Sequence, residues 1–168
     1  MRADLETEYV EFVTARLPAL RRLAYLLVGD AHRGDDLVQQ TCTSLYVHWA
    51  KARTAGSLDA YVRRMLIRSF VDERRRGWFR RVHLAGEAVD RAAPEPADAA
   101  QRLVVHQALA RVPRRQRAVL VLRFLYDLPV AEVAEVLACS PGTVKSQTSH
   151  GLAALRRLLG EPAREGKR

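Results

Sequence analysis

The segment 130–150 constrains the fold most, because its pattern predicts two helices joined by a tight turn. Ser140 lies where a helix N-cap is expected, since its hydroxyl can accept a hydrogen bond from a free N–H of the following helix. Pro141 then occupies the first helical position, where the missing N–H costs nothing. The first helix has one apolar stripe at helical spacing, formed by Val130, Val133, Ala134 and Leu137. The segment therefore predicts a helix-turn-helix.

The second helix of this pair is predicted to have two different faces. Its packing side is mostly apolar and comprises Val144, Thr148, Gly151, Leu152, Leu155 and Leu159. Its outward side comprises Ser146, Ser149, His150 and Ala153, flanked by Lys145, Arg156 and Arg157. Short polar groups flanked by cations are typical of a helix that enters the major groove of DNA. The alternative is an ordinary helical hairpin with a solvated polar face.

The charge balance favours a polyanionic partner. The chain has 168 residues, with Lys+Arg 28 against Asp+Glu 19 and a formal net charge of +9. Such a balance favours nucleic acid or an acidic membrane surface. No run is long and apolar enough to span a bilayer, and the N-terminus lacks a signal-peptide pattern. We therefore expect a soluble, cytoplasmic protein with no membrane insertion.

The cysteines indicate neither a disulfide framework nor a metal centre. The chain has two cysteines, Cys42 and Cys139, which lie within apolar helical patterns or in the turn that follows one. We expect reduced, buried thiols, and too few further ligands lie nearby to make a zinc site. The expectation is no metal and no cofactor.

Prolines divide the chain into two domains. Residues 84–101 are rich in alanine and acidic side chains, and Pro94 and Pro96 flank a glutamate at their centre. This composition favours an extended, solvated backbone. We predict an all-α fold of two small helical domains, over residues 5–81 and 102–160, joined by a flexible linker over residues 82–101. The C-terminal domain contains the helix-turn-helix.

The N-terminal domain is predicted to contain helices over residues 12–28, 35–49 and 58–76. Their apolar stripes are Leu17, Leu20, Leu23, Ala24 and Leu27, then Val38, Cys42, Leu45 and Trp49, then Tyr61, Val62, Met65 and Leu66. The opposite face of the second helix is polar but hardly charged, with Asp36, Gln39, Gln40 and Thr43. A purely solvated face usually carries Lys and Glu, so this face predicts a protein contact.

Cations and aromatic rings alternate at the end of the third helix. Residues 74–76 are arginines, and Trp78 and Phe79 follow before two further arginines. Such a mixture suits single-stranded nucleic acid, because cations contact the phosphates while rings stack on unpaired bases. The alternative is that the rings close the core and the arginines are solvated.

Several segments resemble one family in their order along the chain. They are DLVQQT (36–41), YVRRML (61–66) with DERRR (72–76), LARVPRRQRAVL (109–120) and GTVKSQ (142–147). The chain resembles an extracytoplasmic-function (group 4) RNA polymerase sigma factor of the sigma-70 family, and looks closest to the actinobacterial sigma-E branch. The resemblance covers nearly the whole chain.

The resemblance implies a mechanism without covalent chemistry by the chain itself, so no catalytic residue and no enzyme activity are expected. Such a factor binds core RNA polymerase through the β′ clamp helices and the β flap, recognises the −35 duplex, and binds the unpaired −10 strand. Opening the duplex costs stacking and pairing energy, which contacts to phosphates and flipped bases offset. Many relatives are restrained by an anti-sigma factor.

The resemblance also implies residue roles. The polymerase contact falls on Asp36, Gln39 and Gln40, with the apolar run 121–125 against the β flap. The −10 strand contacts fall on Arg63, Arg64, Arg68 and Arg75. The −35 contacts fall on Thr143, Lys145, Ser146, Ser149 and His150, with Arg115 on a phosphate.

Some positions depart from the family pattern. Asn is usual where Arg68 stands, and Gln40 and Cys42 replace a common acidic residue and a common Phe. Pro129 replaces a capping Ser, and Gln147 and His150 stand where Arg is frequent. These changes predict an unusual −35 preference rather than a lost function.

Other functions are also compatible with a basic helical chain. A stand-alone helix-turn-helix regulator would bind duplex DNA as a dimer, without polymerase. A small nuclease would need clustered carboxylates or histidines to hold a metal. The acidic residues here are scattered, and the five histidines lie far apart in the sequence.

Overall fold

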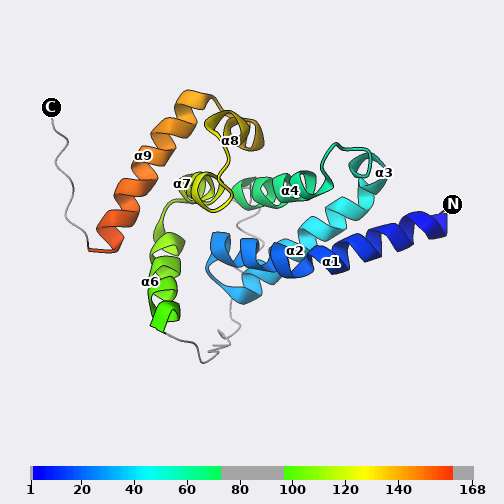
Figure 1. Cartoon of the computed structure of the whole chain (residues 1–168), viewed down its shortest axis with the longest axis horizontal. Coiled ribbons are helices and arrows are strands. Elements are labelled where there is room, and N and C mark those ends of the chain that lie inside the picture. Colours follow the sequence, from blue (N-terminus) through cyan, green and yellow to red (C-terminus); the bar gives the residue numbers. More distant parts are fainter. Residues whose placement is uncertain (1, 73–96, 161–168) are drawn as a thin grey trace. The chain divides into compact units, whose positions relative to one another are not determined.

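The computed structural model describes residues 2–72 and 97–160. The chain divides into two compact units, Met1–Gly86 (unit 1) and Glu87–Arg168 (unit 2). Within the described residues every regular element is a helix, as Figure 1 shows, which confirms the all-α prediction.

Unit 1 consists of α1 (Arg2–Val28), α2 (Ala31–Val47), the short α3 (Trp49–Ala52) and α4 (Leu58–Asp72). Helix α2 packs against both α1 and α4, and α1 also contacts α4. The largest fully buried side chains of this unit are Leu23, Leu27, Leu37, Leu45, Leu66, Ile67 and Phe70. Most of them belong to the stripes expected from helical spacing, and removing these apolar surfaces from water drives the packing.

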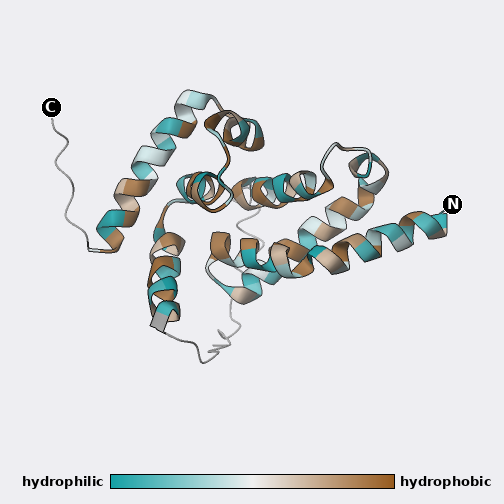
Figure 2. Ribbon diagram, in the orientation of Figure 1, coloured by the Kyte–Doolittle hydropathy of each residue, from teal (hydrophilic) through white to brown (hydrophobic). Residues whose placement is uncertain are grey.

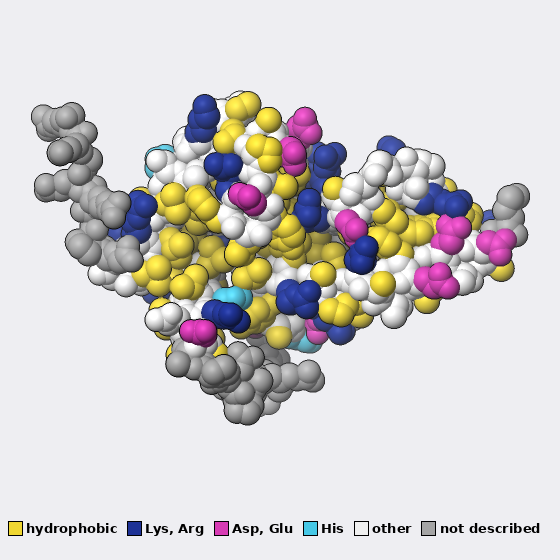
Figure 3. Space-filling view, in the orientation of Figure 1, with side chains coloured by type: hydrophobic (Ala, Val, Ile, Leu, Met, Phe, Trp, Pro, Cys, Tyr) yellow, Lys and Arg dark blue, Asp and Glu magenta, His cyan; other side chains and the backbone are white. Residues whose placement is uncertain are grey.

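Helix α1 begins at Arg2, well before the predicted start at Phe12. The extension is held by aromatic contacts: the Tyr9 and Trp49 rings meet edge to face, with 5.4 Å between centroids. The Tyr9 hydroxyl also donates to the Cys42 carbonyl oxygen at 2.7 Å. Asp4 and several glutamates interrupt the apolar period here, so helical spacing did not reveal this part of the helix. The N-terminal stretch of α1 is largely teal in Figure 2, and magenta acidic side chains gather toward that end in Figure 3.

The other boundaries in unit 1 follow local capping. Gly29 adopts φ 79° after α1, and Asp30 then caps α2 by accepting from the Arg33 N–H at 3.0 Å. Helix α2 therefore begins at Ala31, earlier than the predicted residue 35, and ends at Val47. Helix α4 begins at Leu58 as predicted, whereas residues 73–76 of the predicted helix lie outside the described residues.

Unit 2 consists of α6 (Ala97–Arg111), α7 (Arg114–Leu120), a π-helical turn η2 (Val121–Leu125), α8 (Val130–Leu137) and α9 (Pro141–Leu158). Helix α9 packs against α6, α7 and α8. Helix α6 begins at Ala97, within the segment expected to be a linker. Its alanines favour a helix, and Asp98 in the first turn complements the helix dipole.

The helix-turn-helix prediction is confirmed by α8, a tight turn and α9. Ala138 ends α8 in the left-handed conformation, with φ 51°. Ser140 then accepts from the Thr143 N–H at 3.1 Å, and Pro141 opens α9. The predicted stripe of α8 packs inward, with Val133, Ala134 and Leu137 buried and Val130 half-buried.

Two features are absent from the residues that the structure describes. None of the helices found there is sufficiently long and apolar to cross a membrane. No group of at least three His, Cys, Asp or Glu residues within the same ranges could hold a metal ion.

Candidate nucleic-acid interface

Helix α9 presents its predicted outward face to solvent. Its inward side is closed by Val144, Gly151 and Ala154, which are buried. The outward candidates Lys145, Ser146, Ser149 and His150 are exposed, and Thr143 is half-buried. Ser140 caps the N-terminus of α9. Its hydroxyl accepts a hydrogen bond from the Thr143 N–H and lies 2.9 Å from the Thr143 hydroxyl. The structure therefore brings these five candidates together near one helix end.

Close packing against α7 holds α9 in place. A Cβ added at Gly151 would lie 3.1 Å from Leu120 Cγ and 3.3 Å from Gln116 Cβ, so the two helices approach closely at this glycine. Arg115 is exposed on α7. Helix α7 packs directly against α9, and the phosphate contact expected for Arg115 stays a prediction.

Arg117 is a structural residue that the sequence reasoning missed. Its side chain is buried, and its Nη2 donates to the carbonyl oxygens of Ala110 at 2.6 Å and Val112 at 2.7 Å. The guanidinium thereby satisfies backbone acceptors at the turn between α6 and α7. One signal was available in the sequence: Arg117 precedes Leu120 and Val121 at helical spacing, which places it on the buried side.

In unit 1, the predicted polymerase-contact residues lie on one face of α2. Asp36 and Gln39 are exposed, and Gln40 is half-buried. The same face continues at Tyr46 and Val47, which are 53% and 72% exposed. The sequence reasoning missed these two side chains, although their spacing from Thr43 matches one further helical turn.

Helix α4 carries the arginines expected to contact the −10 strand. Arg64 and Arg68 are exposed and stand one helical turn apart, and Arg63 is half-buried beside them. Arg75 lies outside the described residues, so its position relative to these three stays a prediction.

A hollow of about 310 Å³ separates the later turns of α2 and α4, and we name it the α2–α4 groove. Helix α2 contributes Gln40 and Ser44, its C-cap residue is His48, and α4 contributes Met65, Arg68, Ser69 and Asp72. The groove therefore brings Gln40, expected at the polymerase contact, beside Arg68, expected at the DNA strand. Sequence spacing did not indicate that these two would meet.

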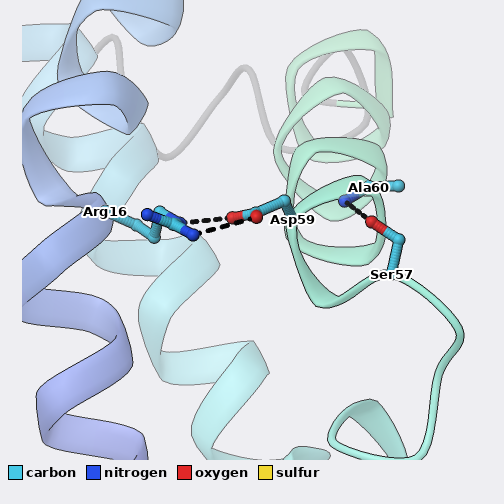
Figure 4. Close-up of polar contacts among 4 residues, drawn as sticks. All are labelled: Arg16, Ser57, Asp59 and Ala60. Atoms are coloured by element: carbon cyan, nitrogen blue, oxygen red, sulfur yellow. Dashed lines mark hydrogen bonds and ion pairs between the residues drawn. The ribbon is translucent and has the colours of Figure 1, made fainter.

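An ion pair fixes the start of α4 against α1. The Arg16 guanidinium donates to both Asp59 carboxylate oxygens, and the Nη2 to Oδ2 distance is 3.0 Å (Figure 4). The hydrogen bond to Asp59 raises the pKa of Arg16. Beside it, the Ser57 hydroxyl accepts from the Ala60 N–H at 3.2 Å and caps α4. These contacts hold the first turn of α4 against α1.

The apolar run 121–125 divides between core and surface. Val121 and Leu122 are buried, whereas Phe124 and Leu125 are 55% and 57% exposed in the π-helical turn. Two exposed apolar side chains of this size form a surface that a protein partner can cover.

Comparison with known proteins identifies the family. Residues 12–80 match the family described as Sigma-70 region 2, and residues 102–155 match Sigma-70, region 4. The RNA polymerase sigma-E factor of Streptomyces coelicolor is 32% identical over 157 residues, which span 90% of this chain and 86% of that protein. This chain belongs to the sigma-70 family, as an extracytoplasmic-function sigma factor. The resemblance stated from the sequence is thereby confirmed.

Further relatives place this sigma factor in the same group. The ECF RNA polymerase sigma factor SigL of Mycobacterium tuberculosis is 31% identical over 147 residues, covering 84% of this chain and 83% of the relative. The fold matches the sigma factor RpoE of Bartonella quintana, solved with the anti-sigma factor NepR, at a TM-score of 0.68. That match has 23% identity and covers 91% of this chain and 97% of the other.

The family assignment decides between the functions considered from the sequence. A sigma factor directs promoter recognition by RNA polymerase, and this chain carries both the region 2 and the region 4 segments. A stand-alone helix-turn-helix regulator has no need of a region 2 domain, so the match over residues 12–80 excludes that alternative.

Proposed function

We propose that this sigma factor binds core RNA polymerase through the exposed face of α2 and the unpaired −10 strand through α4. Helix α9 then recognises the −35 duplex. The observation that carries this proposal is the division of exposed polar surface among these three helices. The α2 face carries one carboxylate and one amide, from Asp36 and Gln39. Helix α4 carries exposed arginines, and α9 carries short hydroxyl side chains beside one lysine.

The chemistry of each face suits its proposed partner. Exposed guanidinium groups on α4 bind phosphates of any sequence, and their binding weakens with salt because counterions are released. The serines and His150 on α9 are short and hydrogen-bonding, which suits contacts to base edges in the major groove. Arg115 adds a phosphate contact that sets the register of α9 on the duplex.

The two domains would act together across the predicted linker. Residues 5–81 form the core- and −10-binding domain, residues 102–160 the −35-binding domain, and residues 82–101 the predicted connection, whose last residues belong to α6. Phe124 and Leu125, exposed in η2, supply the surface for the β flap. The protein works in the cytoplasm, where core polymerase and promoter DNA are found.

Co-purification with bacterial core RNA polymerase tests the proposal. Size-exclusion chromatography at moderate salt should yield a stoichiometric complex, and that complex should initiate run-off transcription from selected promoters. A chain that elutes apart from core enzyme, or that shifts duplex DNA only by itself, would contradict the proposal.

Paired variants test the α2 face directly. Asp36→Ala with Gln39→Ala should weaken binding to core polymerase while leaving the helical circular dichroism unchanged, because both side chains are exposed. Asp98→Ala with Gln101→Ala is the matched control, since the same residue types stand exposed at the same spacing on α6. Equal affinity of both double variants for core enzyme would remove the α2 face from the interface.

A further inference from the structure

Two exposed ion pairs from α1 hold the two ends of the loop between α3 and α4, which comprises residues 53–57 and is named the α3–α4 loop. At its start, Arg53 Nη2 lies 3.0 Å from both carboxylate oxygens of Glu8. Just after its end, Asp59 in the first turn of α4 accepts from Arg16 (Figure 4). Glu8 and Arg16 stand about two turns apart on α1. One helix therefore holds both ends of this loop, through what we call the loop-end ion pairs.

Aromatic packing fixes the part of α1 from which the loop-end ion pairs extend. Next to Glu8, the Tyr9 ring meets the buried Trp49 ring edge to face. The Phe12 ring lies 5.7 Å from the same Trp49 ring, and the Arg16 guanidinium lies 5.8 Å from the centre of the Phe12 ring. Exposed ion pairs usually contribute little, because two long side chains must be ordered. Here the aromatic contacts hold the helix in place beforehand, which lowers that cost.

The α3–α4 loop itself is ordered mainly in its first half. The Thr54 hydroxyl donates to the Lys51 carbonyl oxygen at 2.7 Å, and the Ala55 N–H donates to the Ala52 carbonyl oxygen at 3.0 Å. These bonds continue the last turn of α3. A Cβ added at Gly56 would meet none of the described atoms within 4 Å, and glycine has the greatest backbone freedom. The second half of the loop therefore depends on how firmly its two ends are held.

The loop-end ion pairs reduce the freedom that this loop has before it meets a partner. The loop directly precedes α4, and Arg53, Thr54, Gly56 and Ser57 are exposed. A segment that is already ordered loses less conformational entropy when a partner binds it. Glu8 lies ahead of the segment that matches Sigma-70 region 2, which begins at residue 12. A part of α1 outside that match thus supplies one of the two pairs.

We propose that Glu8 and Arg16 are positioning residues for promoter opening. They order the α3–α4 loop before DNA binds, and they act through the loop rather than by touching DNA. Opening is faster as a result, because the strand bound by α4 does not have to order the adjoining loop as well. This inference rests on the proposed contact between α4 and the −10 strand.

The rate of promoter opening by the holoenzyme tests the proposal. Core RNA polymerase, saturated with the full chain, is mixed with a selected promoter that carries 2-aminopurine in its −10 element, and fluorescence reports unstacking of the bases. Glu8→Gln and Arg16→Gln should each slow opening about twofold to fivefold, the range that one exposed ion pair can supply. Arg21→Gln is the matched control, because it breaks an exposed pair from α1 to Asp35 that involves no residue of the loop. Opening by both variants at the rate of this control would overturn the proposal.

Gly56→Ala tests whether the loop-end ion pairs act by ordering the loop. The added methyl group meets open space and restricts the backbone. It should therefore favour opening more in the Glu8→Gln and Arg16→Gln double variant than in the wild type, whose loop is already held. If the pairs only fastened α4 to α1, Gly56→Ala would change the opening rate by the same factor in both backgrounds. That result would contradict the proposal.

Arg64→Gln separates this inference from the function on which it rests. Arg64 is exposed on α4 and forms no part of the loop-end ion pairs. If Arg64→Gln slows opening while Glu8→Gln and Arg16→Gln match the control, the role of the ion pairs is wrong and the α4 contact stands. If Arg64→Gln opens the promoter as fast as the wild type, the proposed −10 role of α4 fails, and the inference fails with it.

Discussion

The two units of this sigma factor use arginine in opposite ways to hold their helices. In unit 1, Arg16 reaches Asp59 across the surface, and Arg21 contacts Asp35 at 3.1 Å in the same exposed manner. In unit 2, Arg117 is buried and donates to backbone carbonyls of Ala110 and Val112. The same residue type thus forms screened ion pairs in one unit and a buried link between helices in the other.

This difference predicts which substitutions should destabilise each unit, and by how much. An exposed ion pair contributes little, because water and salt screen it and two long side chains must be ordered. A buried donor that satisfies backbone acceptors contributes more, since its loss leaves those acceptors without partners away from water. Substitutions in the two units should therefore differ in size and in salt dependence. Amide hydrogen exchange, followed by mass spectrometry, can report each unit separately.

Arg117→Met is the strongest test of the comparison. It should lower the free energy of unfolding of unit 2 by about 3 kcal/mol, because the carbonyls of Ala110 and Val112 lose their buried donor. Hydrogen exchange should accelerate in α6, α7 and α9 and remain unchanged in unit 1. Arg111→Met, exposed on α6, is the control. Equal small effects of the two substitutions would show that burial of Arg117 adds nothing.

Ser140→Ala should have the next largest effect. Loss of the N-cap should destabilise unit 2 by about 1 kcal/mol, because the Thr143 N–H loses its acceptor. Exchange should rise first in the initial turn of α9, and affinity for −35 duplex should fall with it. Ser146→Ala removes a serine hydroxyl that does not cap the helix, so it should leave exchange unaltered.

Arg16→Gln and Asp59→Asn should produce a smaller effect, confined to unit 1. Either substitution should speed exchange slightly at the start of α4, because the pair tethers α4 to α1. The double substitution should be no worse than either single one, as expected for partners in one interaction. At about 1 M salt, where screening acts within roughly 3 Å, the difference from wild type should largely vanish. An effect that persists at high salt would show that this pair, like Arg117, makes an interaction that salt does not screen.

His106 should give the smallest effect, visible only as a pH dependence of unit 2. Burial lowers the pKa of His106 from its ordinary value of 6.5, so the folded state favours the neutral ring. The unfolded state then binds more protons, and stability is complete above pH 6.5 and decreases as pH falls through the lower folded pKa. His106→Gln should flatten this decline, measured by denaturant unfolding between neutral and mildly acidic pH. His32→Gln in unit 1 should leave the slope of unit 2 as it was.

Much of the fold could be predicted because helices leave a periodic record in the sequence. The buried stripe Leu20, Leu23, Ala24 and Leu27 follows directly from helical spacing. The start of α9 follows from Ser140 and Pro141, whose local chemistry acts within one turn. The early start of α1 could not be predicted, because this part of the helix is held by the ring contact of Tyr9 with Trp49, a residue distant in sequence.

In the candidate site, too, some features could be predicted from local sequence and others depended on how the helices pack. The outward faces of α2 and α9 could be assigned from spacing alone, since each lies opposite a clear apolar stripe. Whether Gln40 and Arg68 would line one groove depended on how α2 packs against α4. No local pattern encodes that packing.

By itself, the sequence determined the all-α class, the helix-turn-helix with its Ser140 cap, and the family, because each rests on residues within a few turns or on ordered motifs. Only the tertiary structure decided that Arg117 is buried, that the Tyr9 side chain extends α1, and that Arg68 and Asp72 share a groove with Gln40. These facts arise from contacts between helices distant in sequence. The free energy of such contacts depends on which surfaces meet. Helical periodicity indicates which face of a helix is buried, but not which other helix covers that face.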